Sequence, residues 1–182
     1  MREISLHIMD VAENGITAGA GFLHIIIEED RIKNRLKVTI KDNGKGMSPD
    51  MLRKVTDPFV TSRTTRRVGL GLSLLNEAAK RCDGIFSVES EPGRGTSVTA
   101  TCRYDHIDRA PIGDIAGTIT MLIAGNPDID FAYDHVIDGN IFVTDTRELR
   151  KELGESLTDP ALLFHMKKQI EEELKKLATE GV

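Results

Sequence analysis

The sequence lacks the features that place a chain in a membrane or in an oxidising compartment. No apolar run approaches the roughly 18 residues that a membrane-spanning helix needs, and the first residues, Met1–Ser5, contain no signal-peptide core. The two cysteines, Cys82 and Cys102, have neither the spacing nor the partners of a metal site. We therefore expect a cytoplasmic protein with reduced thiols and no membrane partner.

The composition is that of an ordinary globular protein, but its charge is unevenly distributed. The 182 residues are 40% hydrophobic, with 16 glycines against 6 prolines, and the net charge of −5 argues against nucleic acid as a partner. Residues 1–104 hold 16 Lys and Arg against 13 Asp and Glu, whereas residues 105–182 hold 8 against 16. The two balances, +3 and −8, predict a domain over 1–104 and an acidic C-terminal module over 105–182 that faces solvent or a partner protein.

Hydrophobic periodicity and turn residues predict the order of helices and strands. Helices are expected over residues 3–18, from Ser48-Pro49 onward, from the end of the Val68–Ser73 segment to about Cys82, and over 111–124, 147–153 and 160–177. Strands are expected over residues 22–28, 36–42, 84–90, 96–102, 131–136 and 140–144. For the first domain this order predicts one sheet with helices packed on one face, and the last two strands should form a hairpin.

The first helix carries a carboxylate and a carboxamide four residues apart, at Asp10 and Asn14. Residues at that spacing share one face of a helix, so both side chains project into the same space. A carboxylate can take a proton or order a water molecule, and an amide oxygen is a ligand that Mg²⁺ accepts beside phosphates. The pair alone is weak evidence, because many surface helices carry Asp and Asn.

Two glycine-marked segments would supply the rest of a nucleotide site. Asp42 ends a strand and is followed by Gly44 and Gly46, whose freedom lets a flat ring approach the main chain. A carboxylate at that point would accept a hydrogen bond from the exocyclic amine of adenine. Guanine presents a carbonyl there, which cannot donate one, so the carboxylate would select adenine. A plain turn explains this segment equally well.

The second segment, Gly69 and Gly71, precedes a helix whose N-terminus favours anions. The loop upstream of it, residues 61–67, includes Arg63 and is polar and cationic, so it could fold over a triphosphate as a lid.

Taken together, these motifs resemble the GHKL family of ATP-binding domains, which includes DNA gyrase, mismatch-repair ATPases, a heat-shock chaperone and histidine kinases. The resemblance covers about residues 4–102. Its motifs are, in order, Asp10-x-x-x-Asn14 with Thr17–Ala20, Asp42-x-Gly44-x-Gly46, Asp57-Pro-Phe59, Gly69-x-Gly71 and Gly95-Thr96. It implies an α/β two-layer sandwich of the Bergerat, histidine-kinase-like type, followed by a small C-terminal α+β appendage.

The resemblance also implies roles for single residues. Asn14 would ligate Mg²⁺, Asp42 would receive the adenine amine, and Thr96 would share a water molecule with Asp42 and the base. Gly44 and Gly46 would shape the base pocket, and Gly69 and Gly71 would border the phosphates of ATP.

The catalytic position is the point at which this sequence departs from the family. Branches that hydrolyse ATP or phosphorylate serine usually have Glu four residues before the Asn, whereas this chain has the shorter Asp10. We therefore expect a regulatory protein that binds ATP and Mg²⁺ and gates an unidentified partner protein. A kinase acting in trans, resembling the anti-sigma kinases, and a slow ATPase stay open as alternatives, and so does a homodimer.

Two histidines invite a functional interpretation that we do not favour. His7 lies three residues before Asp10 on the same helical face, where a structural role is the simpler reading. His106 begins a run that resembles a phosphoacceptor histidine, but its acidic residue is displaced by one position. The run also follows the ATP-binding motifs, whereas histidine kinases place the acceptor before them.

Overall fold

The computed structural model of the chain describes residues 3–56, 70–153 and 157–180. The helices are α1 (Ile4–Thr17), α2 (Pro49–Thr56), α3 (Leu70–Arg81), α4 (Ile115–Gly125), α5 (Thr146–Leu153) and α6 (Pro160–Glu180). The strands are β1 (Phe22–Asp30), β2 (Arg35–Asp42), β3 (Phe86–Glu91), β4 (Gly95–Arg103), β5 (Asp130–Ile137) and β6 (Asn140–Asp145). Each lies within a few residues of its predicted position.

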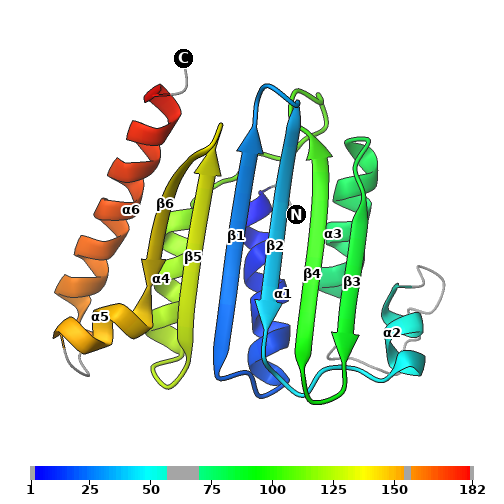
Figure 1. Ribbon diagram of the computed structural model, residues 1–182, viewed down its shortest axis with the longest axis horizontal. Helices are drawn as coiled ribbons and strands as arrows, with labels where there is room; N and C mark the ends of the chain where they lie inside the picture. Colours follow the sequence, from blue (N-terminus) through cyan, green and yellow to red (C-terminus); the bar gives the residue numbers. More distant parts are fainter. Residues whose placement is uncertain (1–2, 57–69, 154–156, 181–182) are drawn as a thin grey trace.

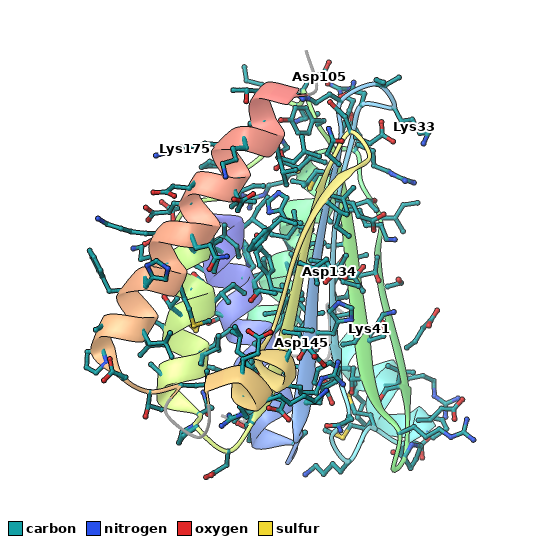
Figure 2. All side chains as sticks on the ribbon, turned by 60° about the vertical axis from the view of Figure 1, so that its left-hand side comes forward. Lys33, Lys41, Asp105, Asp134, Asp145 and Lys175 are labelled. Atoms are coloured by element: carbon teal, nitrogen blue, oxygen red, sulfur yellow. The ribbon has the colours of Figure 1, made fainter. Side chains whose placement is uncertain are left out.

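The six strands form one sheet in the order β3-β4-β2-β1-β5-β6 (Figure 1). Helices α1, α3, α4 and α6 lie together on one side of it, as the turned view in Figure 2 shows. The opposite face carries polar side chains that include Lys41, Asp134 and Asp145 (Figure 2). The predicted two-layer α/β sandwich is confirmed.

The core lies between the sheet and the helices and follows the alternation of the strands. In β1, Leu23, Ile25 and Ile27 are buried, whereas the intervening side chains are only partly covered. One face of α1 contributes Ile8 and Val11. Because strand side chains alternate between faces and helical side chains repeat every three to four residues, these sequence patterns fix which faces meet.

Helix α1 ends where glycine permits it, next to the loop of the candidate site. Gly19 has a φ of +78° and donates its N–H to the carbonyl of Ile16. This is the left-handed conformation that commonly stops a helix, and it is open to glycine at little cost. At the start of α2, the predicted cap is present, because Ser48 Oγ accepts from the N–H of Met51 at 3.3 Å.

Beyond the predicted boundary at residue 104, the sheet continues. Strand β5 pairs with β1 in parallel, with Leu23 opposite Phe131 and Ile27 opposite His135. Strand β6 then adds to β5 as the predicted hairpin. The small α+β part therefore shares the sheet of the first part.

Helix α4 begins at Ile115, four residues later than the predicted start at Pro111. The carbonyls of Pro111 and Ile112 accept hydrogen bonds from the first backbone N–H groups of α1, at 2.9 and 2.8 Å. Asp114 caps the helix by accepting from the N–H of Gly117 at 2.8 Å. Because α4 starts later, residues 111 and 112 stay outside it and their carbonyls can pair with the N-terminus of α1.

In the described part of the chain, no helix is both long enough and apolar enough to cross a membrane.

Candidate nucleotide site

The candidate site lies at one end of the sheet, where β2 ends, β4 begins and α1 passes above them. A cavity of about 90 Å³ opens there. Its polar lining includes Asn14, Asp42 and Thr96, and its apolar lining includes Val11 and Leu72. One helix and two strands distant in sequence, α1, β2 and β4, therefore bring the predicted metal-binding and base-binding side chains to one pocket.

Asp42 lines this cavity and is held by two backbone donors. Its Oδ1 accepts from the N–H of Gly44 at 2.8 Å, and the N–H of Thr96 also donates to the carboxyl group. Burial raises the pKa of Asp42, and the two N–H donors oppose that rise in part. A half-buried carboxyl group held in this way offers a directed acceptor to a planar ligand.

Gly15, which the sequence reasoning did not select, lets Asp42 approach α1. A Cβ atom at Gly15 would lie 2.9 Å from Cβ of Asp42 and 3.2 Å from its Oδ2. That separation is shorter than real Cβ contacts, so a larger residue would displace the carboxylate. A glycine inside a helix destabilises it by about 0.5–1 kcal/mol relative to alanine, which is the sequence signal that could have identified this position.

The loop after Asp42 is tied down on both sides. Asn43 Oδ1 accepts from the N–H groups of Gly21 and Phe22, each at 2.9 Å. Ser90 Oγ accepts from the N–H of Met47 at 2.9 Å and lies 3.0 Å from Thr96 Oγ1. These side chains fix the loop of residues 43–47 to β1 and β3, and sequence reasoning missed both of them.

The backbone at Gly46 lies so close to the end of β3 that only glycine fits there. Its φ is +65°, and a Cβ atom there would lie 1.9 Å from the carbonyl oxygen of Glu91. The Asp42-x-Gly44-x-Gly46 pattern is therefore a packing requirement of this end of the sheet as well as a predicted binding motif.

Asn14 and Asp10 lie on the side of α1 that faces the start of α3. A Cβ atom at Gly71 would lie 2.9 Å from Cβ of Asp10 and 3.7 Å from Nδ2 of Asn14. Asn14 lines the cavity, whereas Asp10 lies one turn earlier in α1 and is not part of the lining. The predicted phosphate end and the carboxylate–carboxamide pair are thus neighbours.

Several predicted features fall outside the described residues. Arg63, Gly69 and the expected lid over 61–67 belong to this group, as does the Asp57-Pro-Phe59 motif. The roles given to them stay predictions, and so do the binding roles of the residues that the structure places at the cavity.

Among the described residues, no group of three or more His, Cys, Asp or Glu side chains could hold a metal ion by itself. The donor set at the cavity fits a different arrangement, in which one amide oxygen of Asn14 assists phosphate oxygens. Mg²⁺ usually keeps several water molecules and takes few protein ligands beside phosphates.

The structure gives the surroundings of the two histidines discussed above. His7 is buried, which lowers its pKa, and its Nδ1 finds no hydrogen-bond partner in the described part of the chain. His106 is largely covered and lies 3.6 Å from a carboxylate oxygen of Asp83.

Known proteins resemble this chain over the same region. The family model described as histidine kinase-, DNA gyrase B- and HSP90-like ATPase matches residues 2–106. Sporulation kinase D of Bacillus subtilis is 34% identical over 94 residues, which are 52% of this chain and 18% of that protein. The non-motile and phage-resistance protein of Caulobacter vibrioides is 31% identical over 97 residues, which are 50% of this chain and 12% of that protein.

A solved structure extends the likeness of fold into the C-terminal part. The ATPase domain of MutL from Aquifex aeolicus, complexed with ADP, superposes with a TM-score of 0.50 at 16% identity. The superposition covers 85% of this chain and 68% of that one. The fold of this chain is therefore the two-layer sandwich that this solved domain also has. Because the family model spans more than half of its length, this chain belongs to the histidine kinase-, DNA gyrase B- and HSP90-like ATPase family.

Proposed function

We propose that the protein binds ATP with Mg²⁺ in the cavity at the end of β2 and β4, and that the bound nucleotide gates its interaction with a partner protein. The single observation that carries the proposal is the common cavity lined by Asn14, Asp42 and Thr96. Asp42 offers an acceptor to the adenine amine on one side. Asn14 faces the start of α3 on the other.

The chain's own residues divide the work of binding. Asp42 selects the base, because a fixed carboxylate accepts from the amine of adenine and repels the carbonyl of guanine. Gly71 at the start of α3 leaves the backbone accessible to an anion, whose charge the helix N-terminus favours. Bound Mg²⁺ would neutralise phosphate charge, with the amide oxygen of Asn14 as its protein ligand.

The architecture also suggests how the nucleotide would affect a partner. Strand β1 pairs with β2, which ends in Asp42, and on its other edge with β5 of the acidic part. A change at the cavity would therefore act on a strand that both parts share. A nucleotide alters partner binding only as far as it favours one of the two conformations of the protein.

A kinase acting in trans is the second candidate. The similar proteins include sporulation kinases, and Asp10 lies one helical turn before Asn14, where a proton acceptor would be placed. Asp10 is one methylene shorter than the usual Glu, and a general base must come within about 3 Å of its proton or act through one water molecule. We therefore expect transfer or hydrolysis to be slow.

Calorimetry with ATP and GTP, each with and without Mg²⁺, tests the binding site directly. We expect ATP to bind more tightly than GTP, and Mg²⁺ to strengthen binding. Asn14→Ala should remove the Mg²⁺ dependence, whereas Asn76→Ala, a half-exposed amide on α3, should keep it. Equal affinity for the two nucleotides, or Mg²⁺ dependence that survives in Asn14→Ala, contradicts the assignment.

Incubation with γ-labelled ATP and cell extract separates the candidate functions. A labelled second protein indicates a kinase, and free phosphate released without a partner indicates an ATPase. A partner that co-purifies only in the presence or only in the absence of ATP and Mg²⁺, without transfer of label, supports the proposed gate. A partner that is captured equally well with and without ATP and Mg²⁺ overturns the proposed gate.

A further inference from the structure

The two cysteines of the chain, twenty residues apart in sequence, touch in the fold. Cys82 follows the last residue of α3, and Cys102 is the penultimate residue of β4. Their Sγ atoms lie 3.2 Å apart. Both are free thiols, of which Cys82 is 1% exposed and Cys102 is partly exposed.

The backbone around the pair is already held in place. The N–H of Arg103 donates to the carbonyl of Cys82 at 2.8 Å, and the N–H of Gly84 donates to Ala79 at 2.9 Å. Bonded sulfur atoms lie about 2.05 Å apart, so the two sulfurs need to approach by only about 1 Å. Side-chain rotation can supply that movement while α3 and β4 stay where they are.

We propose that Cys82 and Cys102 form a reversible thiol–disulfide site, oxidised by a low-molecular-weight disulfide such as oxidised glutathione. The partly exposed Cys102 thiolate attacks the disulfide and releases one thiolate as leaving group. The Cys82 thiolate then attacks Sγ of Cys102 and displaces the second. Two protons and two electrons leave the protein, and the oxidant is reduced to two thiols.

The surroundings of Cys102 set the speed of the first step. Burial and the neighbouring Cys82 thiol raise the pKa of Cys102 to about 12. Because the thiolate is the nucleophile, oxidation should be slow near neutrality and accelerate about tenfold per pH unit between pH 7 and 9. The site therefore responds to sustained oxidation and ignores brief exposure.

The bond would join two elements at their ends remote from the cavity. Leu72, in the first turn of α3, and Thr96, the second residue of β4, both line the cavity, so the near ends of the two elements border the candidate nucleotide site. A link between the far ends closes residues 82–102 into a loop and restricts the unfolded chain. We expect oxidation to stabilise this half of the sheet and to leave nucleotide binding within about threefold of the reduced protein.

The test uses the full chain treated with oxidised glutathione at pH 8.5. Mass spectrometry under denaturing conditions should show the loss of two hydrogens, with no glutathione adduct remaining and no thiol left to alkylate. The melting temperature should rise by about 5 °C or more and return after treatment with a thiol reductant. Cys102→Ser and Cys82→Ala should each lose the response, and the wild-type measurement stands even if one variant folds poorly.

Three outcomes overturn the proposal. These are a stable glutathione adduct on Cys102 with Cys82 still free, a disulfide formed only between two chains, and two thiols that persist after prolonged oxidation at pH 8.5. None of the three depends on nucleotide binding, so they leave the proposed function untouched.

Discussion

Strand β1 separates two halves of the sheet that are specified in different ways. On the side of β2, β4 and β3 all pairings are antiparallel, and glycines shape the end that carries the cavity. On the other side β5 joins β1 in parallel, after a connection that contains α4. The first half is organised by local signals around the candidate site, and the second by one long-range pairing.

A buried polar trio marks that pairing. His135 Nε2 lies 2.8 Å from Glu29 Oε1, and His135 Nδ1 lies 2.5 Å from Tyr133 Oη. His135 is 2% exposed. Such a trio stabilises the fold only while all of its members are paired, because a single unpartnered member is costly in a buried setting.

The largest expected effect is a loss of stability when this trio is broken, with no loss of ATP affinity. His135→Ala should lower the free energy of unfolding by about 2–3 kcal/mol, because it removes the histidine partner of the largely covered Glu29 carboxylate and of the buried Tyr133 hydroxyl group. Urea unfolding measures this change. Calorimetry should find the affinity for ATP unchanged within about twofold once the folded fraction is taken into account.

The matched control is His24→Ala, which breaks a 2.8 Å pair with Asp134 across the same two strands. Both side chains of that pair are more than one-fifth exposed, so its loss should cost less than about 1 kcal/mol. Equal losses in the two variants would remove the distinction between the buried pairing and the open face.

The second effect is the reverse: ATP affinity should fall and stability should stay nearly the same. Asp42→Asn should weaken ATP binding by about 2 kcal/mol, or roughly 30-fold, because it places donors where the adenine amine needs an acceptor. Stability should change little, since an Asn oxygen can still accept from the N–H of Gly44. Asp50→Asn, at an exposed position on α2, is the control. Unaltered preference for ATP over GTP in Asp42→Asn would disprove the base contact.

Much of the pocket half could be predicted from the sequence because its signals are short-range. Asp10 and Asn14 needed only the helical repeat, and Asp42 needed only a strand followed by glycines. What the sequence could not supply is the approach between elements. Gly15 makes room for Asp42 because of the way α1 packs against β2. Ser90 joins Met47 to Thr96 because of the way β3 pairs with β4. Neither packing arrangement can be read from the sequence.

Gly15→Ala tests that approach and should have an intermediate effect. The added Cβ would lie 2.9 Å from Cβ of Asp42, so the carboxylate must shift and ATP affinity should fall about tenfold, or 1.4 kcal/mol. The helix itself should gain about 0.5–1 kcal/mol from the better helix former. Gly125→Ala, where no atom lies within 4 Å of the new Cβ, should leave affinity unchanged. Undiminished affinity in Gly15→Ala would show that Asp42 tolerates displacement.

The C-terminal half shows where sequence patterns stop being informative. Alternation predicted the hairpin of β5 and β6, but a hairpin pattern does not say which strand it will join, or in which direction. The acidic composition of residues 105–182 suggested a separate module, yet the buried faces of β5 and α4 continue the same core. Net charge describes mainly the exposed side chains, and it does not predict which apolar faces pack together.

The smallest effect concerns the cap that links α4 to α6. Asp114 accepts from the N–H of Gly117 and from Lys167 Nζ, each at 2.8 Å, and these donors, Lys167 foremost, lower its pKa below the usual 3.8. Asp114→Ala should cost about 1 kcal/mol through the lost cap. Asp114→Asn keeps a capping oxygen and loses only an exposed ion pair, so it should cost a few tenths of a kcal/mol.

The pH dependence of that small difference follows from the direction of the pKa shift. A carboxyl group whose pKa is lower in the folded state than in the unfolded state stabilises the fold above the unfolded pKa. The contribution disappears as the pH falls through the folded value. The difference between wild type and Asp114→Asn in urea unfolding should therefore be constant from pH 7 down to about pH 5 and shrink below about pH 4. A difference that grows on acidification would mean that Lys167 does not stabilise the ionised form, and that α6 is held to α4 by apolar packing alone.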